Sequence, residues 1–506
     1  MQHFEIPFPV RTDSYKGGHF LMYPAANKMV AYGEFRKPYP SVDDDRIVLF
    51  GTRYVVENVL NHKYTVEEVE AADKFFKTHN AGFTPYPFPK DLFLKFIKEN
   101  NGYFPIKVEA LQDGTVIYPH TPVYQITAEG EYAHLCTYLE TLLTMIWYPT
   151  TVATLSRHCR SLIQTFFDDT VDPENFWKLD SRLHDFGYRG CTSQEQAVIG
   201  GTAHLLNFGG SDTMSAAYYA QFHLNGGKPV ASSIPATEHS VMTSYATEQE
   251  AVEKMIEMFG QNKEINQLGI FATVGDSYDY NNFLEKIVPT VAKKFTGKWG
   301  LWVIRPDSGN PVDCVINALN AAEKTFGYDL NKKGFKVIRG AAVIQGDGIT
   351  IVEINRILEM AKMYGFSAEN IAFGMGAGLL QKLNRDTMSF ATKLSHITYA
   401  DGRTMDIMKR PSDDKGKNSL PGIVKVSMEK ETKILKVYPI ETLTDAADMR
   451  LQLIYNNGPV NIEWPTFDEI KSNILEQYKY LPKHADAIST QMYYKIAELV
   501  DKKKKV

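Results

Sequence analysis

The chain has 506 residues, a formal net charge of -5, and 44% hydrophobic against 23% charged residues. This composition is typical of a globular protein of several domains and excludes a disordered chain. The acidic balance argues against a nucleic-acid-binding protein. Four cysteines without a C-x-x-C pair argue against both a structural zinc site and a disulfide framework.

Nothing in the sequence indicates a membrane segment. The first residues lack the basic and apolar regions of a secretory signal. The longest weakly polar stretch, residues 141–156, contains Pro149 and is shorter than the ~20 apolar residues of a membrane span. We therefore expect a cytoplasmic protein that binds neither membranes nor nucleic acid.

The amino-terminal part of the chain mixes strands and helices. Residues 47–50 and 115–118 are short runs of β-branched and aromatic residues, which predict strands. Residues 66–79 have the apolar spacing of a helix.

The middle of the chain repeats one pattern, in which an apolar run leads into Gly, Arg and Asp residues. Continuous apolar runs predict strands that are buried on both faces and paired in parallel. Helix-like stretches separate them, and Thr192 with Glu195 has the spacing of a capping box. Such βα units build a barrel or an open doubly wound sheet. The apolar runs are residues 183–186, 270–274, 301–304, 341–344 and 371–373.

The carboxyl-terminal part again differs from the middle. Residues 422–427 and 434–438 predict antiparallel strands. We therefore predict an α/β protein, with a (β/α) barrel-like catalytic domain at 147–385. Residues 1–146 and 386–506 would form one composite α+β flanking domain.

The clusters of Arg, Asp and Gly lie after the apolar runs rather than before them. In either βα architecture the carboxyl ends of the strands carry the chemistry, so this asymmetry indicates an enzyme. Arginines beside glycine-rich turns suit phosphate, and carboxylates suit sugar hydroxyls or Mg²⁺. A structural ion pair is the alternative for any single Arg–Asp pair. The candidate residues are Arg189, Arg305, Arg385, Asp279, Asp307 and Asp347.

The familiar cofactor motifs are missing. The sequence has no G-x-x-x-x-G-K-[ST], no H-E-x-x-H and no G-x-S-x-G. The segment 374–378 starts like a dinucleotide fingerprint, but Leu379 stands where the third glycine belongs. These absences argue against P-loop, zinc-protease, hydrolase and nicotinamide-cofactor redox chemistry.

Segments spread over nearly the whole chain resemble nicotinamide phosphoribosyltransferases. The resemblance implies a type II phosphoribosyltransferase architecture and a homodimer with active sites at the subunit interface. It implies transfer of a phosphoribosyl group from phosphoribosyl pyrophosphate to nicotinamide, giving nicotinamide mononucleotide and pyrophosphate, in NAD biosynthesis. The matching segments are 13–16 (DSYK), 183–190 (LHDFGYRG), 211–213 (SDT), 235–240 (PATEHS), 275–279 (GDSYD), 304–311 (IRPDSGNP), 343–348 (VIQGDG) and 379–386 (LLQKLNRD).

The resemblance assigns three residues to nicotinamide. Phe186 matches the aromatic side chain that stacks on the pyridine ring, and Tyr15 matches the opposite face, supplied by the other subunit. Asp212 matches the carboxylate that accepts the amide NH₂ and repels nicotinate. Without the family, Asp212 could equally be a helix N-cap before Thr213.

The resemblance assigns further residues to the phosphoribosyl group, and it implies Mg²⁺ without identifying its ligands. Arg189 and Arg305 match the pyrophosphate site. The ribose side is matched by Asp307, Gly346 and Asp347, and the 5′-phosphate site by Gly376, Ala377 and Arg385. The cations expected from the partner chain are Arg36, Lys393 and Lys409.

His239 matches a histidine that ATP phosphorylates, so ATP is expected as an activator and Glu238 as a neighbour that orients the ring. Read alone, such a histidine is more often a cap or a packed residue. We count His239, Arg305, Asp307 and Asp279 as the catalytic set.

Some positions depart from the family pattern. Gly275 and Ala391 stand where serines are expected, and Ala377 replaces a glycine of the phosphate turn. Residues 410–420 align too poorly for a role to be given to Lys415 or Lys417. The alternatives are a nicotinate phosphoribosyltransferase and a non-catalytic binding protein on the same fold.

Overall fold

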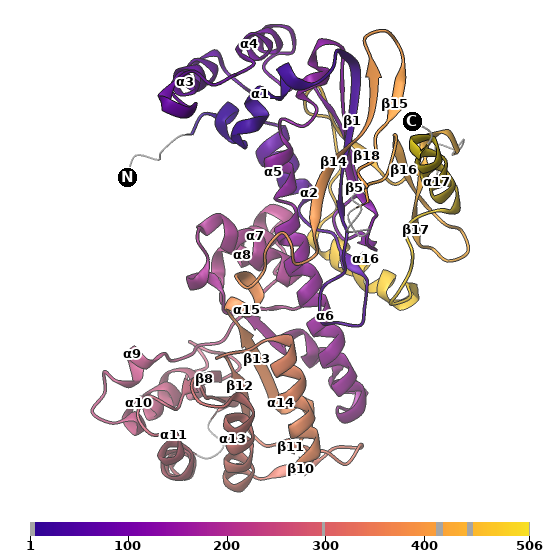
Figure 1. Cartoon of the computed structure of the whole chain (residues 1–506). Coiled ribbons are helices and arrows are strands. Elements are labelled where there is room, and N and C mark those ends of the chain that lie inside the picture. Colours follow the sequence, from indigo (N-terminus) through magenta and orange to yellow (C-terminus); the bar gives the residue numbers. More distant parts are fainter. Residues whose placement is uncertain (1–5, 296–298, 411–417, 443–448, 505–506) are drawn as a thin grey trace. The chain divides into compact units, whose positions relative to one another are not determined.

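The computed structural model describes residues 6–295, 299–410, 418–442 and 449–504 (Figure 1). Two compact units divide it. The first unit is made of residues 1–154, 385–465 and 469–506, and the second of residues 155–384 and 466–468. The first unit therefore combines the two ends of the chain, and the second consists mainly of its middle.

The first division falls inside helix α6 (Trp147–Thr170), later than the expected boundary at residues 146 and 147. The first turns of α6 contribute hydrogen bonds to the first unit. The Thr150 hydroxyl accepts the N–H of Phe50 (3.2 Å), and the Thr154 hydroxyl accepts the N–H of Val48 (3.1 Å). These buried bonds explain why the start of α6 belongs with the amino-terminal residues.

An antiparallel sheet is the frame of the first unit. Its described strands pair in the order β15-β14-β1-β5-β3-β18. The buried strand β1 pairs with β14 on one side and with β5 on the other. Two short ladders, β2-β4 and β16-β17, contain the strands predicted in the two flanks. The strands are β1 (Ala26–Phe35), β2 (Ile47–Val48), β3 (Lys107–Ala110), β4 (Val116–Ile117), β5 (Pro122–Glu129), β14 (Phe390–Tyr399), β15 (Thr404–Asp406), β16 (Val424–Met428), β17 (Leu435–Pro439) and β18 (Gln452–Asn456).

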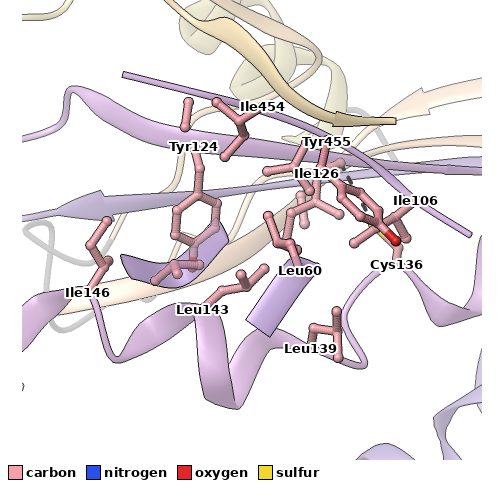
Figure 2. Close-up of a cluster of buried hydrophobic side chains, with 14 of the residues drawn as sticks. Leu60, Ile106, Tyr124, Ile126, Cys136, Leu139, Leu143, Ile146, Ile454 and Tyr455 are labelled. Atoms are coloured by element: carbon pink, nitrogen blue, oxygen red, sulfur yellow. Dashed lines mark hydrogen bonds between the residues drawn. The ribbon is translucent and has the colours of Figure 1, made fainter. Parts of the chain in front are cut away.

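Aromatic and aliphatic side chains from sheet and helices form the core of this unit (Figure 2). Tyr124 and Tyr455 are buried there, and the Tyr455 hydroxyl donates to the carbonyl of Phe104 (2.9 Å). A buried phenol is tolerated because its O–H has a partner. The helices are α1 (Ser14–Met22), α2 (Thr52–Val55), α3 (Val66–Phe76), α4 (Lys90–Glu99), α5 (Glu140–Thr144), α16 (Phe467–Tyr480, whose first residues fall in the second unit) and α17 (Thr490–Lys504).

A parallel sheet is the frame of the second unit. Within the described residues, its strands follow the order β7-β6-β13-β12-β9-β8, and every neighbouring pair is parallel. The five predicted apolar runs are strands of this sheet. The strands are β6 (Leu183–Asp185), β7 (Gly210–Ser211), β8 (Ile270–Val274), β9 (Leu301–Arg305), β12 (Ala341–Gln345) and β13 (Ile371–Met375), with a separate hairpin of β10 (Tyr328–Leu330) and β11 (Lys336–Ile338).

Residues 230–237 join the two edge strands of this sheet. Ser232 forms a parallel bridge with Gly210 of β7, and Ala236 forms one with Ala272 of β8. Side chains from around the ring, including Ile234 and Val303, pack together in its interior. The sheet thus curls into a barrel-like ring in which one segment is only bridged, because Pro235 has no N–H for a ladder.

Helices lie between the strands of the second unit, as βα units require. Asn310 caps α13 by accepting the N–H groups of Val312 (3.0 Å) and Asp313 (3.2 Å), and Pro311 occupies the first turn. The Thr192–Glu195 box is wrong by one position, because Ser193 is the N-cap of α7 and accepts from Gln196. The helices are α7 (Gln194–Leu205), α8 (Met214–Tyr218), α9 (His239–Met242), α10 (Glu248–Met255), α11 (Tyr280–Asn282), α12 (Val288–Phe295), α13 (Pro311–Phe326), α14 (Ile351–Met363) and α15 (Ala377–Leu380).

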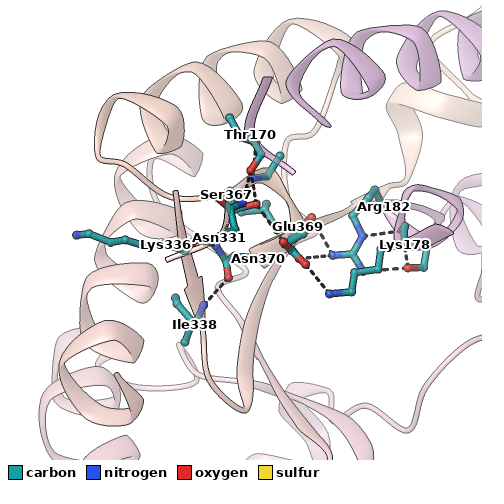
Figure 3. Close-up of polar contacts among 12 residues, drawn as sticks. Thr170, Lys178, Arg182, Asn331, Lys336, Ile338, Ser367, Glu369 and Asn370 are labelled. Carbon is teal, nitrogen blue, oxygen red and sulfur yellow. Dashed lines mark hydrogen bonds and ion pairs between the residues drawn. The ribbon is translucent and has the colours of Figure 1, made fainter. Parts of the chain in front are cut away.

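A polar network closes the amino ends of β6 and β13 (Figure 3). Arg182 donates to the carbonyl of Glu369 (2.7 Å), and the nearly buried Glu369 carboxylate pairs with Lys178. Asn370 accepts the N–H of Ile338 (2.9 Å). This end of the strands is therefore built for stability, which leaves the carboxyl ends for function. Among the described helices, none is both long and apolar enough to cross a membrane.

Candidate functional site

Phe186 lies at the carboxyl ends of β6 and β13. Its N–H donates to the carbonyl of Met375 (3.1 Å). Its ring occupies the space that a side chain on Gly374 would need, since a Cβ there would lie 2.1 Å from Cε2 of Phe186. The guanidinium carbon of Arg305 is 5.4 Å from the ring centroid. An aromatic surface and a cation therefore meet at this edge of the sheet.

Arg305 is the last residue of strand β9, and its side chain contacts Asp307, which in turn lies next to His239. Its Nη2 donates to Oδ1 of Asp307 (2.7 Å), and Oδ2 of Asp307 is 3.3 Å from Nε2 of His239. Nε of Arg305 is buried and has no hydrogen-bond partner among the described residues. The structure thus brings together three of the four residues expected to be catalytic.

Asp276, rather than Asp279, is the other carboxylate beside His239. Its Oδ1 lies 3.8 Å from Nε2 of His239 and is buried without a hydrogen-bond partner in the described residues, while its Oδ2 accepts from Ser308. Asp279 caps α11 by accepting the N–H of Asn282 (3.0 Å). Asp276 was not identified from the sequence. Side chains alternate between the two faces of a strand, and this alternation places Asp276 on the same face as Ala272, which packs in the barrel interior.

Ser277, not Glu238, holds the ring of His239. Nδ1 of His239 is 3.0 Å from the Ser277 hydroxyl. Glu238 instead accepts from Ser240 (2.5 Å). The imidazole is half-exposed, with 46% of its side-chain surface accessible. The ring is thus held on one side and remains open to a ligand.

Asp185 precedes Phe186 in the chain, and a backbone hydrogen bond links Asp185 to Asp212 at the end of the neighbouring strand β7. The N–H of Asp212 donates to the carbonyl of Asp185 (3.0 Å), and the Asp212 carboxylate accepts from Ser233 (2.5 Å). Asp185 is fully buried and its Oδ1 accepts the N–H of Gly187 (2.7 Å). Burial raises the pKa of Asp185 to about 6, and the Asp212 charge acts in the same direction.

The exposed Asp212 carboxylate is not a helix cap. Thr213 occupies the N-cap position of α8, and no side chain there makes a capping bond. The functional interpretation of Asp212 therefore does not compete with a capping role at this position.

Further candidates follow neighbouring strands of the same sheet. Gly346 and Asp347 follow β12, Gly376 and Ala377 follow β13, and Arg189 follows β6. Arg189 and Asp347 are exposed. Because carboxyl ends of parallel strands share one edge, these residues lie along the same edge as Phe186 and Arg305.

The first unit holds the remaining candidates. Lys393 is partly buried, and burial together with the charges of Arg36 and Lys409 lowers its pKa. Nε of Arg36 is buried and lacks a hydrogen-bond partner in the described part of the chain. These three side chains form a cationic cluster, which attracts anions.

Tyr15 and Arg385 also belong to the first unit. Tyr15 is about half exposed and its hydroxyl donates to Asp13 (3.3 Å). Burial and the carboxylates of Asp13 and Glu140 raise the pKa of Tyr15, whereas Arg385 opposes this rise. Arg385 is exposed beside Asp386 (3.1 Å). Sequence reasoning grouped Arg385 with the turn after β13, and the chain divides between them.

Packing accounts for one of the departures from the family pattern. A Cβ on Gly275 would lie 2.5 Å from the Phe283 ring, so serine would need a shifted ring there. Ala377 is the first residue of α15, and it follows Gly376, whose φ of -92° any residue can adopt. Ala391 is buried in strand β14. Lys415 and Lys417 lie outside the described residues.

Comparisons with known proteins agree along the chain. Residues 181–457 match the model of the nicotinate phosphoribosyltransferase (NAPRTase) family, and residues 8–108 match the nicotinamide phosphoribosyltransferase N-terminal domain. A nicotinamide phosphoribosyltransferase of Xanthomonas campestris is 35% identical over 93% of this chain and 98% of its own length. One of Mycoplasma genitalium is 29% identical over 83% and 96%.

A solved structure extends the similarity to the fold. The crystal structure of a nicotinate-nucleotide pyrophosphorylase from Pyrococcus furiosus superposes with a TM-score of 0.60 at 16% identity. It covers 95% of this chain and 99% of its own. At this identity the likeness concerns the fold: a parallel barrel-like sheet together with an antiparallel sheet domain.

Proposed function

The chain belongs to the nicotinate phosphoribosyltransferase family, and we infer that it is a nicotinamide phosphoribosyltransferase of NAD salvage. It transfers the phosphoribosyl group of phosphoribosyl pyrophosphate to nicotinamide, giving nicotinamide mononucleotide and pyrophosphate. The observation that carries this proposal is the contact of Phe186 with Arg305 at the strand edge that also holds Asp212. A flat ring binds there beside a cation suited to pyrophosphate.

Recognition of the base rests on stacking and on one carboxylate. Phe186 orients the pyridine ring but does not distinguish its substituents. Asp212 accepts the amide N–H of nicotinamide and repels the carboxylate of nicotinate. The hydrogen bond from Ser233 limits the rotation of the Asp212 carboxylate and so favours this recognition.

Transfer depends on charge stabilisation. As the C1–O bond of the ribose loosens, negative charge develops on pyrophosphate, and Arg305 and Arg189 stabilise it. Asp307 holds the guanidinium of Arg305 in place and, with Gly346 and Asp347, contacts the ribose. Gly376, Ala377 and Arg385 bind the 5′-phosphate. Asp279 stays a candidate, although its helix-capping bond favours Asp276 in its place.

The residues around His239 fit a magnesium ion. Asp276 and Asp307 present carboxylate oxygens, and Oδ1 of Asp276 is buried and unpartnered among the described residues. Mg²⁺ in proteins usually has one or two carboxylates and completes its shell with water and substrate phosphates. When bound, the ion would neutralise charge on pyrophosphate.

We further propose that ATP phosphorylates His239 and thereby stimulates turnover. The ring is accessible, and it lies 3.3 Å from the carboxylate that holds Arg305. A phosphate there adds negative charge next to the pyrophosphate site and changes the binding of Mg²⁺ and substrate.

We also propose that the enzyme is a homodimer with active sites at the subunit interface. Tyr15 of one subunit closes the base site of the other, and the cationic cluster of Arg36, Lys393 and Lys409 reaches the phosphates. Nε of Arg36 is buried and has no hydrogen-bond partner among the described residues, which supports binding of an anion by this cluster.

Substrate preference tests the proposal. Purified protein with phosphoribosyl pyrophosphate and Mg²⁺ should release pyrophosphate with nicotinamide at least several-fold faster than with nicotinate. Asp212→Asn removes the repulsive charge and should narrow or reverse this preference. Equal turnover by the wild type would contradict the proposed selectivity, and better turnover of nicotinate would indicate a nicotinate enzyme. No pyrophosphate release with either base would indicate a non-catalytic binding protein.

A further inference from the structure

The loop after β6 carries Phe186 and Arg189 at its start, and one side chain from a different loop braces it. Nε2 of Gln381 donates to the carbonyl of Gly187 (2.9 Å) and to Sγ of Cys191 (3.1 Å). Gln381 thus holds both ends of the turn formed by residues 187–191. Its amide lies against Gly190, where a Cβ would be 2.7 Å from Oε1 of Gln381.

Gln381 is itself anchored to the turn after β13. Its own N–H donates to the carbonyl of Ala377 (3.0 Å), which starts α15. A second glutamine strengthens the same joint, because Gln196 donates to the carbonyl of Leu380 (3.2 Å) and accepts the N–H of Thr192 (2.8 Å). The turn after β13 and the loop after β6 are therefore linked by side chains as well as by the sheet.

The bonds of Gln381 require an amide at this position. Nε2 of Gln381 meets acceptors at both places, because the Gly187 carbonyl only accepts and Sγ of Cys191 accepts from the amide while its own S–H donates to the same carbonyl (3.5 Å). An apolar side chain offers no donor, and a carboxylate would face the Gly187 carbonyl with a like partial charge. Both kinds of substitution leave the loop without its brace.

We propose that Gln381 is a positioning residue that couples the phosphate turn after β13 to the loop holding Phe186 and Arg189, and so sets the affinity for nicotinamide. This inference rests on the proposed function. It assigns no contact between Gln381 and substrate. Its effect on binding passes through the placement of the Phe186 ring.

Gln381→Met tests this, because methionine has a similar length and no donor. We expect the KM for nicotinamide to rise about tenfold, as the loss of one or two hydrogen bonds implies, with a much smaller change in kcat. Gln381→Glu should raise the KM for nicotinamide further. If Gln381→Met does not fold, Gln381→Glu takes its place in the test. Gln221→Met is the matched control, since Gln221 donates to the carbonyl of Gly227 (3.1 Å) in the same unit and far along the chain from the loop.

A double-mutant comparison separates positioning from general loss of stability. In a Phe186→Leu background, Gln381→Met should raise the KM for nicotinamide by no more than about twofold, because the ring through which it acts is gone. An unchanged KM in the single variant, or the full tenfold rise in the Phe186→Leu background, would overturn the proposal.

Hydrogen exchange measures how well Gln381 holds the loop, independently of enzyme activity. Amides of residues 187–191 should exchange faster in Gln381→Met than in the wild type and in Gln221→Met. Wild-type protein that makes no nicotinamide mononucleotide would contradict the proposed function, whereas unchanged exchange in Gln381→Met would contradict the bracing itself. The two failures are therefore distinguishable.

Discussion

At the scale of single residues, glycines decide where the Phe186 ring can lie. Gly374 leaves the space that the ring fills, and Gly346 borders it, since a Cβ there would lie 3.0 Å from Cε2 of Phe186. Neither glycine has a positive φ, so close approach of the ring, rather than backbone conformation, explains their small size.

Gly374→Ala should displace the Phe186 ring and raise the KM for nicotinamide by about tenfold or more, given the weight of aromatic packing. Gly346→Ala should have a smaller effect, because its contact is looser. Gly209→Ala is the control: its nearest neighbours would be 3.8 Å away, and the residue lies in the same unit. Steady-state kinetics with varied nicotinamide measures the series, and equal effects of all three variants would contradict this role of the ring.

Asp185 is a buried carboxyl whose charge costs stability. Burial raises its pKa from 3.8 to about 6, so the folded protein holds this proton more tightly than the unfolded chain. The stability that protonation contributes is therefore complete below pH ~4 and is lost as the pH rises through ~6. The change corresponds to about 3 kcal/mol as an upper bound.

Asp185→Asn should remove this pH dependence, because asparagine keeps an acceptor for Gly187 and does not ionise. The variant should gain unfolding free energy relative to the wild type between pH 4 and pH 7.5, by up to about 3 kcal/mol. Urea denaturation of both proteins at several pH values measures the gain. A difference that stays constant across this range would show that Asp185 does not titrate in it.

At the scale of elements, the closure of the barrel-like ring rests on few bonds. Residues 230–237 pair with the sheet at single bridges, and Thr237 adds a side-chain bond by accepting the N–H of Val274 (2.9 Å) through its hydroxyl. Thr237 is buried, so no solvent replaces this bond.

Thr237→Val keeps the size of the side chain and leaves the Val274 N–H buried without a partner. We expect the unfolding free energy to fall by about 1–3 kcal/mol, the cost of an unsatisfied buried donor. Thr165→Val on the exposed side of α6, where the hydroxyl donates to the carbonyl of Leu162 (2.7 Å), should change stability much less. Equal denaturation midpoints for wild type and Thr237→Val would mean that the segment does not depend on this bond.

Apolar runs in the sequence predict five strands of the parallel sheet, but not every buried strand, since β1 is buried from Met29 to Phe35 and was not predicted. The runs at 270–274 and 341–344 are five-residue strands in the structure, because apolar residues on both faces leave few alternatives. Strand β7 and the bridged segment at 230–237 escape prediction. β7 has two residues, and Pro235 with its polar neighbours is typical of a loop.

At the scale of the whole molecule, the fold class follows from the sequence, and the geometry of the candidate site does not. The resemblance gave Phe186, Arg305 and His239, and the strand order brings them to one edge of the sheet. It did not give Asp276 or the brace at Gln381, because both depend on contacts between loops that are distant in sequence. A motif such as GDSYD contains two aspartates, and only the structure tells which one faces His239.

The proposed homodimer predicts that Tyr15 and Phe186 of one chain serve different active sites. Tyr15→Ala and Phe186→Ala should each be nearly inactive alone, because each variant lacks one face of the base site. When the two are unfolded and refolded together, half of the dimers should be mixed, and each mixed dimer has one intact site. The mixture should therefore recover about a quarter of wild-type activity if subunits assort at random. Mixing without refolding is the control. Absence of recovery in dimers shown to be mixed would mean that Tyr15 and Phe186 act within one chain.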